Sequence, residues 1–222
     1  KKKNKVTNSK GILTNTVVST IFAQIFSMSR ALHLSYDLKN KKQLNWTSFD
    51  KFFYNIRDVF DDYFLIVGLG DIGLKLANQL SVFSKNIYAV KSTVPKRKIR
   101  NVRKVYLIND IKKIINKFNF VINLLPHNNE TNNFFDQSVF MCMKKGSFFI
   151  NVGRGDTVVL SDLIKAIKKG NIFSAAIDVY PKKDYLSPYK PTNLKSSIFH
   201  MPEVITTPHI SGLSNKYWKK QI

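Results

Sequence analysis

The 222-residue sequence predicts an α/β fold, a Rossmann-type doubly wound parallel sheet with helices on both faces. Three observations predict this class. Short apolar runs alternate with amphipathic helical patterns from residue 64 onward. The first of these runs leads directly into a glycine-rich turn. No apolar run is long enough to cross a bilayer, so the apolar residues are expected to form a buried core.

The elements follow in chain order. Apolar residues between Val17 and Leu38 recur at helical spacing and predict one long helix with a wide apolar face. Residues 39–51 are polar and predict a connection through Trp46, whereas the aromatic run 52–60 is expected to pack on the core. Beyond it the patterns predict strands at 64–67, 87–91, 120–124, 147–151, 174–178 and 204–206, and helices at 72–82, near 110–117, near 135–143 and at 161–168.

Two longer loops interrupt this alternation. Residues 95–103 read as a solvated basic loop, and residues 181–202 as a long turn-rich segment that holds Pro188 and Pro191.

The glycine-rich turn is the most informative motif. Residues 64–76 read Phe-Leu-Ile-Val-Gly-Leu-Gly-Asp-Ile-Gly-Leu-Lys-Leu, an apolar strand followed by G-x-G-x-x-G and a helical pattern. Gly68 permits a sharp bend, Gly70 lets the chain approach a pyrophosphate, and Gly73 lets the helix pack close to its strand. A pyrophosphate would then lie at the helix amino end, where N–H groups and the helix dipole favour negative charge. A purely structural turn remains the alternative for this spacing. The expected dinucleotide contacts are Gly68, Gly70, Asp71, Ile72 and Gly73.

The end of the second strand predicts the cofactor. Residues 88–93 read Tyr-Ala-Val-Lys-Ser-Thr, at the position where such folds meet the adenosine ribose. An acidic residue there would bond the ribose hydroxyls and repel a 2′-phosphate, but none is present. Lys91 and Ser92, with Lys96 and Arg97, are instead able to contact a phosphate. NADP(H) is therefore the expected cofactor, with NAD(H) possible, although a basic residue also arises here by chance in so lysine-rich a chain.

The charge of the chain raises a different function. Lys and Arg number 36 against 14 Asp and Glu, a formal charge of +22, which is typical of nucleic-acid-binding proteins. The lysines are spread along the chain among many asparagines, and the aromatic residues form no basic groove. We therefore expect no nucleic-acid and no membrane partner. The single cysteine, Cys142, excludes an internal disulfide, and without a secretory signal we expect a cytoplasmic protein.

Four further segments carry a family resemblance. They occur in the order Val-Ile-Asn-Leu-Leu-Pro-His-Asn-Asn-Glu-Thr at 121–131, Ile-Asn-Val-Gly-Arg-Gly-Asp at 150–156, Ala-Ala-Ile-Asp-Val-Tyr at 175–180 and Thr-Pro-His-Ile-Ser-Gly at 207–212. Together with the glycine turn they resemble the D-isomer-specific 2-hydroxyacid dehydrogenase family over roughly residues 10–215. Residues 123–126 and the Trp46 region look most similar to its glyoxylate/hydroxypyruvate reductase A branch, which uses NADPH.

The resemblance implies hydride transfer between a nicotinamide dinucleotide and C2 of a small 2-keto acid, giving a D-2-hydroxy acid. Arg154 matches the family arginine that holds the substrate, a task that suits a planar guanidinium. His209 matches the acid–base residue, since histidine exchanges a proton near neutral pH. Asp178 matches an aspartate near the nicotinamide. Further cofactor contacts are implied for Leu125, Pro126, Thr131, Val152, Gly153 and Gly212.

Two departures from the family pattern affect catalysis. Where the family has a glutamate that orients the histidine, this sequence has Lys183, which would act in the opposite sense. Asp184 follows immediately, and a shifted loop would let it serve as the third catalytic residue. Nearly all of the family's N-terminal substrate domain is absent before Gly11, and that domain would select the keto acid.

The expected organisation follows from this. Residues 1–16 are a remnant of the substrate domain or hinge, residues 17–210 the NAD(P)-binding domain, and residues 211–222 the start of a return segment, so we expect a partial chain. Family members are usually homodimers, and the apolar face of residues 17–38 is the expected interface. Besides a reductase, a dinucleotide-binding module that acts through protein association and a basic nucleic-acid-binding protein stay open as functions.

Overall fold

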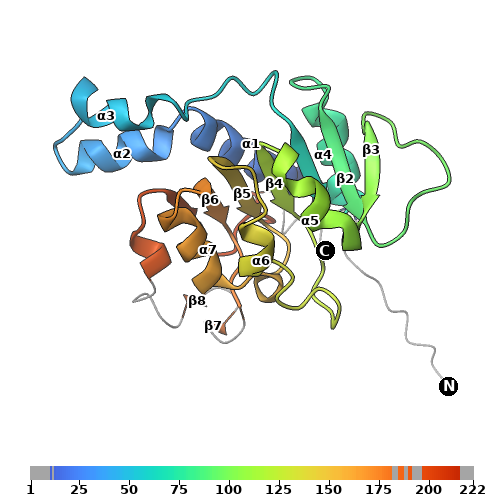
Figure 1. The fold of residues 1–222 in the computed structure, drawn as a ribbon. Helices are drawn as coiled ribbons and strands as arrows, with labels where there is room; N and C mark the ends of the chain where they lie inside the picture. The colour runs from blue at the N-terminus through green and yellow to red at the C-terminus, as the bar shows by residue number, and fades with distance from the viewer. Residues whose placement is uncertain (1–10, 12, 182–184, 188–189, 192–196, 216–222) are drawn as a thin grey trace.

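The computed structural model describes residues 11, 13–181, 185–187, 190–191 and 197–215. Its longer helices are α1 (Thr14–Ser29), α2 (Leu32–Asn40), α3 (Trp46–Phe53), α4 (Asp71–Leu80) and α7 (Leu160–Lys168), and its short ones α5 (Ile111–Ile114) and α6 (Gln137–Phe140). Its strands are β1 (Phe64–Val67), β2 (Ile87–Lys91), β3 (Lys104–Leu107), β4 (Phe120–Asn123), β5 (Ser147–Asn151), β6 (Ile172–Ile177), β7 (Tyr185–Ser187), β8 (Lys190–Pro191) and β9 (Val204–Thr206). Figure 1 shows their arrangement.

The central feature is a seven-stranded sheet in the order β3-β2-β1-β4-β5-β6-β9, and every pairing in it is parallel. The chain builds outward from β1 in one direction and from β4 in the other. The topological switch point therefore lies between β1 and β4. Strands β7 and β8 form a separate antiparallel pair. The predicted doubly wound parallel sheet is confirmed.

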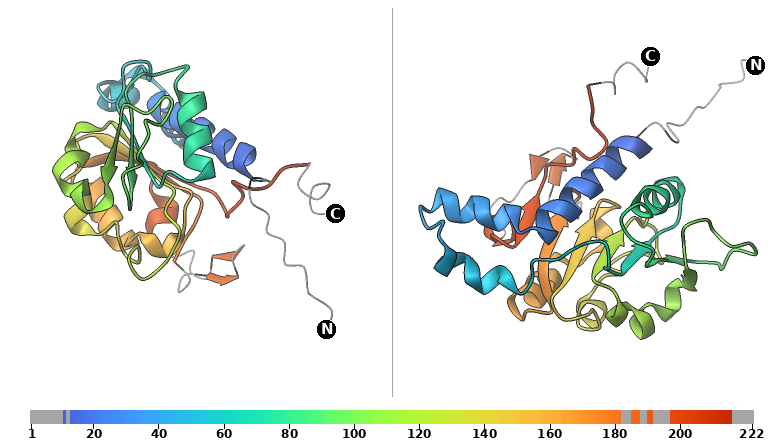
Figure 2. Two further views of the ribbon diagram at one scale, coloured as in Figure 1. Left: turned by 90° about the vertical axis from the view of Figure 1, so that its right-hand side faces the viewer. Right: turned by 90° about the horizontal axis from the view of Figure 1, so that it is seen from above.

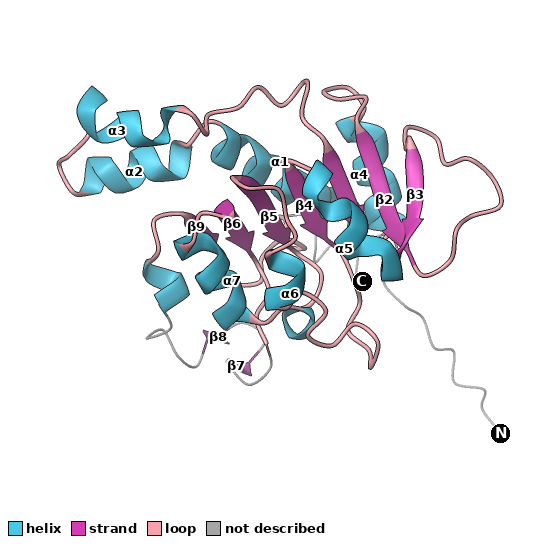
Figure 3. Ribbon diagram, in the orientation of Figure 1, coloured by secondary structure: helices cyan, strands magenta, loops and turns pink. Residues whose placement is uncertain are grey.

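The sheet is covered on both faces because each of its strands carries apolar side chains on both sides. In β1, Phe64 and Ile66 point toward α1 and α4, whereas Leu65 and Val67 point toward the layer of α5, α6 and α7. Figure 3 and the turned views in Figure 2 show this three-layer arrangement. Phe64, Phe120 and Phe148 are register partners and stack across β1, β4 and β5, with ring centroids 5.0 and 4.6 Å apart. This stack fixes the register of the central strands.

The single helix predicted at residues 17–38 is wrong, because the chain breaks it into α1 and α2. Ala31 adopts a left-handed conformation with φ of 52°, and the two helices meet at a bend of 66°. The apolar face of α1 is buried against the sheet and α4. The break lets α1 follow the core while α2 leaves it. Among the described residues no single helix is long and apolar enough to span a membrane, and only the bent pair α1 and α2 meets that criterion together.

Residues 39–51 are only partly the predicted connection, because α3 begins at Trp46. The side chain of Asn45 caps it by accepting the Ser48 N–H at 2.8 Å. Helices α2 and α3 project from the body (Figure 1), and we name residues 32–54 the helical arm. Its exposed large apolar side chains are Leu32, Tyr36, Leu44, Trp46, Phe53 and Tyr54. Of the run 52–60 expected to pack on the core, Val59 is buried whereas Phe53 and Tyr54 are exposed.

Strand β3 is absent from the sequence prediction. It lies at the sheet edge next to the basic loop, and its side chains are exposed or half-buried. Its backbone pairs with β2 from Tyr88 opposite Lys104 to Lys91 opposite Leu107. Backbone hydrogen bonds to β2, rather than burial of apolar side chains, hold β3 in the sheet. The apolar pattern of the sequence therefore gives little indication of this strand.

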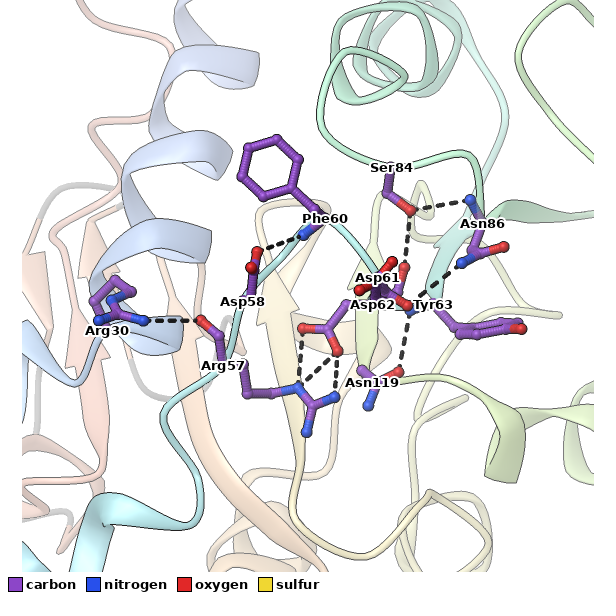
Figure 4. Close-up of polar contacts among 10 residues, drawn as sticks. All are labelled: Arg30, Arg57, Asp58, Phe60, Asp61, Asp62, Tyr63, Ser84, Asn86 and Asn119. Carbon is purple, nitrogen blue, oxygen red and sulfur yellow. Dashed lines mark hydrogen bonds and ion pairs between the residues drawn. The ribbon is translucent and has the colours of Figure 1, made fainter.

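The segment before β1 is fastened to the amino edge of the sheet (Figure 4). Asp62 is buried, and its carboxylate accepts from Arg57 Nε at 2.7 and 2.9 Å and also from the guanidinium Nη2. Ser84 donates its hydroxyl to the Asp62 carbonyl at 2.9 Å, and Tyr63 donates its N–H to Asn119 Oδ1 at 3.1 Å. These contacts fix the position of the start of β1. They lie at the amino ends of the strands, whereas the cleft described below lies at the carboxyl ends.

Candidate dinucleotide and substrate site

A cleft of about 780 Å³ opens at the carboxyl ends of β1, β2 and β4. It lies at the switch point of the sheet, the position at which open α/β folds bind ligands. Its lining residues lie at the ends of β1, β2, β3 and β4 or in the loops after them: Gly68, Leu69, Gly70, Val90, Lys91, Ser92, Ile108, Asn109, Leu124, Leu125, Pro126, Asn128, Glu130, Thr131 and Phe134.

The three glycines of the turn have different tasks. Gly68 has φ of +106°, and a Cβ there would lie 2.9 Å from the Leu124 carbonyl carbon. A Cβ on Gly73 would lie 2.5 Å from the Gly68 carbonyl oxygen. The backbone packing of the turn therefore requires both residues to be glycine. A Cβ on Gly70 would meet nothing within 4 Å.

The space in front of Gly70 is therefore open, and Gly70 is also the N-cap residue of α4, where it contributes no capping side chain. A helix amino end next to an open backbone turn fits a pyrophosphate, because its N–H groups and dipole attract negative charge. The residues present thus fit a dinucleotide with its phosphates on α4. Among the residues with described positions, no group of three His, Cys, Asp or Glu side chains is arranged to hold a metal ion.

The cleft gathers about half of the cofactor contacts expected from the sequence. Gly68, Gly70, Lys91, Ser92, Leu125, Pro126 and Thr131 line it. Within the described part of the chain, its lining does not include Asp71, Ile72, Gly73, Val152, Gly153, Asp178 or Gly212. Gly73 and Gly153 pack behind the lining: a Cβ on Gly153 would lie 2.7 Å from the Leu125 carbonyl oxygen.

The cleft also contains residues that sequence reasoning missed. Ile108 and Asn109 follow β3 and went unnoticed with it, although the short apolar run at 105–108 is a weak signal for the strand. Glu130 is the acidic residue of the lining and comes from the loop after β4, not from the end of β2.

Buried amides connect two loops at this edge. Asn123 Nδ2 donates to Asn151 Oδ1 at 3.0 Å and to Thr157 Oγ1 at 2.7 Å, and Asn123 Oδ1 accepts the Leu125 N–H at 3.1 Å. Thr157 Oγ1 in turn donates to the Arg154 carbonyl at 2.6 Å. The loop that lines the cleft and the turn that carries Arg154 are therefore held by one fully buried network.

The turn that carries His209 depends on Asp178. This fully buried carboxylate accepts the Thr207 hydroxyl at 2.6 Å, the Ile210 N–H at 2.9 Å and the Ser211 N–H at 2.9 Å. Such bonds to an ionised carboxylate are among the stronger hydrogen bonds in proteins. His209 itself is half-buried and has φ of +58°, a conformation uncommon for a residue with a side chain. Asp178 thus has a structural task that its sequence motif did not indicate.

The candidate catalytic side chains follow neighbouring strands. Arg154 comes after β5, Asp178 after β6 and His209 after β9, and these three strands are adjacent at one sheet edge. The Arg154 side chain is exposed and donates from Nη1 to the Gly153 carbonyl at 2.7 Å. An exposed guanidinium suits the binding of a small anion, and a half-buried imidazole suits proton exchange. Asp184 and Lys183 lie outside the described residues.

Comparison with known proteins agrees with this geometry. The family model "D-isomer specific 2-hydroxyacid dehydrogenase, NAD binding domain" matches residues 22–211. A glyoxylate/hydroxypyruvate reductase B of Escherichia fergusonii is 31% identical over 209 residues, which are 92% of this chain and 60% of that protein. The chain thus spans about three fifths of the length of this relative. The relative bears the B name, whereas residues 123–126 and Trp46 had indicated the A branch.

Solved structures show the same fold. A phosphoglycerate dehydrogenase from Lactobacillus plantarum superposes with a TM-score of 0.79 at 23% identity, covering 95% of this chain and 63% of that one. An NADPH-dependent glyoxylate/hydroxypyruvate reductase from Sinorhizobium meliloti gives a TM-score of 0.75 at 23% identity, covering 92% of this chain and 96% of that one.

Proposed function

The chain belongs to the D-isomer specific 2-hydroxyacid dehydrogenase family, and from that membership we propose that it binds NADP(H) and reduces a small 2-keto acid to a D-2-hydroxy acid. The observation that carries the proposal is the cleft at the switch point, where Gly70 leaves the amino end of α4 open. The turns of Arg154 and His209 follow the carboxyl ends of β5 and β9, which lie in the same sheet as the strands of the cleft.

The preference for NADP(H) rests on the end of β2. Lys91 and Ser92 line the cleft there, and a cation with a hydroxyl suits a 2′-phosphate. The Sinorhizobium relative is NADPH-dependent by name. Lys91→Asp should weaken NADPH binding much more than NADH binding in a fluorescence titration. Equal losses for the two dinucleotides would remove Lys91 from the 2′-phosphate site.

The catalytic roles follow from side-chain chemistry. A bound reduced dinucleotide would supply a hydride to C2 of the keto acid. The Arg154 guanidinium would bind the substrate carboxylate through two parallel N–H donors. The His209 imidazolium would give its proton to the carbonyl oxygen, so that the hydride and this proton complete the alcohol. Asp178 would keep the turn of His209 in place through the three hydrogen bonds that it accepts.

The first experiment measures NADPH oxidation with glyoxylate and hydroxypyruvate, together with an NADPH titration on the same sample. Turnover that His209→Ala abolishes, with NADPH binding retained, is the expected result. Turnover that survives in His209→Ala would remove this residue from the mechanism. Absence of both binding and turnover would refute the proposal.

A second candidate is a dinucleotide-binding module that acts through protein association. It is favoured by the exposed apolar side chains of the helical arm, which offer a surface for a protein partner. NADPH binding without turnover would support it over the reductase.

We also propose that the chain forms a homodimer, although not through the predicted face. That face of α1 is buried within the chain, whereas the helical arm exposes Trp46 at 82% and Tyr54 at 90%. A Trp46→Ser, Tyr54→Ser double variant should shift the mass measured by light scattering from dimer to monomer. A wild-type monomer at micromolar concentration would refute the dimer.

A further inference from the structure

Tyr180 lies at the junction of the turns that carry the candidate catalytic residues. It follows Asp178 by two positions, is 8% exposed, and packs its ring against Phe199 with centroids 5.2 Å apart. Its hydroxyl oxygen lies 3.1 Å from the Thr207 carbonyl and 3.3 Å from the Ile177 carbonyl. A buried hydroxyl in this position donates its proton toward the His209 turn.

The carbonyl that receives this hydrogen bond also sets the backbone of His209. The Thr207 carbonyl accepts the His209 N–H at 3.0 Å and so closes a three-residue turn around Pro208. One oxygen therefore binds both the Tyr180 hydroxyl and the His209 main chain. Loss of the hydroxyl would remove one hydrogen bond that this carbonyl accepts, and the turn would be held less firmly.

The conformation of His209 needs such support. Its φ of +58° is disfavoured for a residue with a Cβ, and such conformations persist where the surroundings determine them several times over. Asp178 binds the N–H groups of Ile210 and Ser211, the two residues after His209. Tyr180 binds the carbonyl of Thr207, two residues before His209. The two side chains thus fasten the turn on both sides of His209.

The main chain of Tyr180 meets the Arg154 turn. A Cβ built on Gly155, the residue after Arg154, would overlap the carbonyl group of Tyr180 and the nitrogen of Pro181. Gly155 therefore packs its backbone directly on that of Tyr180. Through its side chain on one turn and its main chain on the other, Tyr180 relates Arg154 to His209.

We propose that Tyr180 is a positioning residue, which sets His209 relative to Arg154 and contacts neither substrate nor cofactor. The proposal rests on the proposed function in one respect, namely the acid–base role of His209. The part that concerns the backbone of the turn stands on the contacts alone.

The experiment is Tyr180→Phe in the 222-residue chain, which removes one oxygen and keeps the ring against Phe199. Tyr63→Phe is the matched control, because Tyr63 lies at the opposite edge of the sheet. Amide hydrogen exchange by NMR reports on the turn without any need for turnover. The Ile210 and Ser211 amides should exchange at least about tenfold faster in Tyr180→Phe, while the amides of β5 and the control stay as in the wild type. Unchanged exchange at these two amides would overturn the proposal.

Kinetics then separate positioning from a merely structural role. In Tyr180→Phe, kcat for hydroxypyruvate should fall by roughly 10- to 100-fold, because small misplacements of a catalytic group have effects of that order, while the Kd for NADPH stays unchanged. An unaltered kcat, or parallel losses in kcat and NADPH affinity, would overturn it. If the Ile210 and Ser211 amides exchange faster in Tyr180→Phe but the wild-type chain itself shows no turnover, the positioning of the turn is upheld and the reductase is refuted.

Discussion

Two alanine substitutions in the glycine turn should have different effects. We expect Gly70→Ala to weaken cofactor binding and Gly73→Ala to lower the stability of the fold. Gly70 has φ of −87° and ψ of −161°, an extended conformation that any residue adopts, and an added Cβ meets no atom within 4 Å. A Cβ on Gly73 would lie 2.5 Å from the Gly68 carbonyl oxygen, where ordinary contact begins at 3.4 Å. The first substitution therefore fills ligand space, and the second disturbs the packing of α4 on the turn.

The magnitudes follow from these clearances. For Gly70→Ala, a lost N-cap preference of about 0.5–1 kcal/mol is offset by about 0.4–1 kcal/mol from reduced freedom of the unfolded chain. Its stability should thus stay within about 1 kcal/mol of the wild type. Gly73→Ala incurs an overpacking cost near the upper end of about 1–3 kcal/mol, because the added Cβ meets the backbone oxygen of Gly68, and it regains about 1 kcal/mol of helix propensity. The net destabilisation should be about 2 kcal/mol.

The assay pairs urea unfolding followed by circular dichroism with a fluorescence titration of NADPH. Gly70→Ala should unfold like the wild type yet bind NADPH at least about tenfold more weakly, a loss of about 1.4 kcal/mol. Gly73→Ala should show the larger loss of stability. Wild-type affinity in Gly70→Ala would refute the reasoning, because the pyrophosphate would then not lie at this turn.

Three further predictions concern groups around the sheet. Thr157→Val removes the hydroxyl of the buried amide network and should destabilise the fold by about 1–3 kcal/mol in urea unfolding, whereas Thr157→Ser retains it; equal behaviour of the two variants would contradict the network. Arg57→Leu leaves the buried Asp62 carboxylate without its cation and should cost about 3 kcal/mol, with Arg57→Lys less affected; a loss below about 1 kcal/mol would show the pair to be dispensable. Burial lowers the pKa of His33 from its ordinary 6.5, against the opposing effect of its hydrogen bond with the Ser27 carbonyl. The unfolded chain therefore binds that proton more tightly, and the stability from neutral His33 is present above pH 6.5 and is lost as pH falls from 6.5 toward the lowered value. His33→Gln should flatten this part of the stability profile, and an unaltered slope would exclude His33 as its origin.

Much of the sheet was predictable because its strands are buried on both faces. Strands β1, β2, β5 and β9 have the predicted bounds, since continuous apolar runs between polar turns leave little freedom of placement. Strand β3 was not predictable from the sequence. It is an edge strand that hydrogen bonds to β2 hold in place, and its side chains stay partly in solvent. The break at Ala31 was also invisible, because the apolar pattern continues on both sides of it.

At the site, the sequence by itself determined the motifs and the family to which they belong. The order strand, glycine turn and helix is local in the chain, and so are the turns of Arg154 and His209, so motif reasoning identifies the family. Gly68, Gly70 and Lys91, which motif reasoning expects to contact a dinucleotide, line the cleft, and their contact with a cofactor stays a prediction.

Only the tertiary structure decided how these residues are held. Asp178 lies more than 25 residues before the Ile210 and Ser211 amides that its carboxylate binds, and Tyr180 reaches the Thr207 carbonyl across a comparable separation. Asn123 likewise meets Thr157 only because β4 and β5 are neighbours. Hydrogen bonds between distant segments depend on strand order and register, and these are set by the collective packing of the sheet rather than by any local pattern.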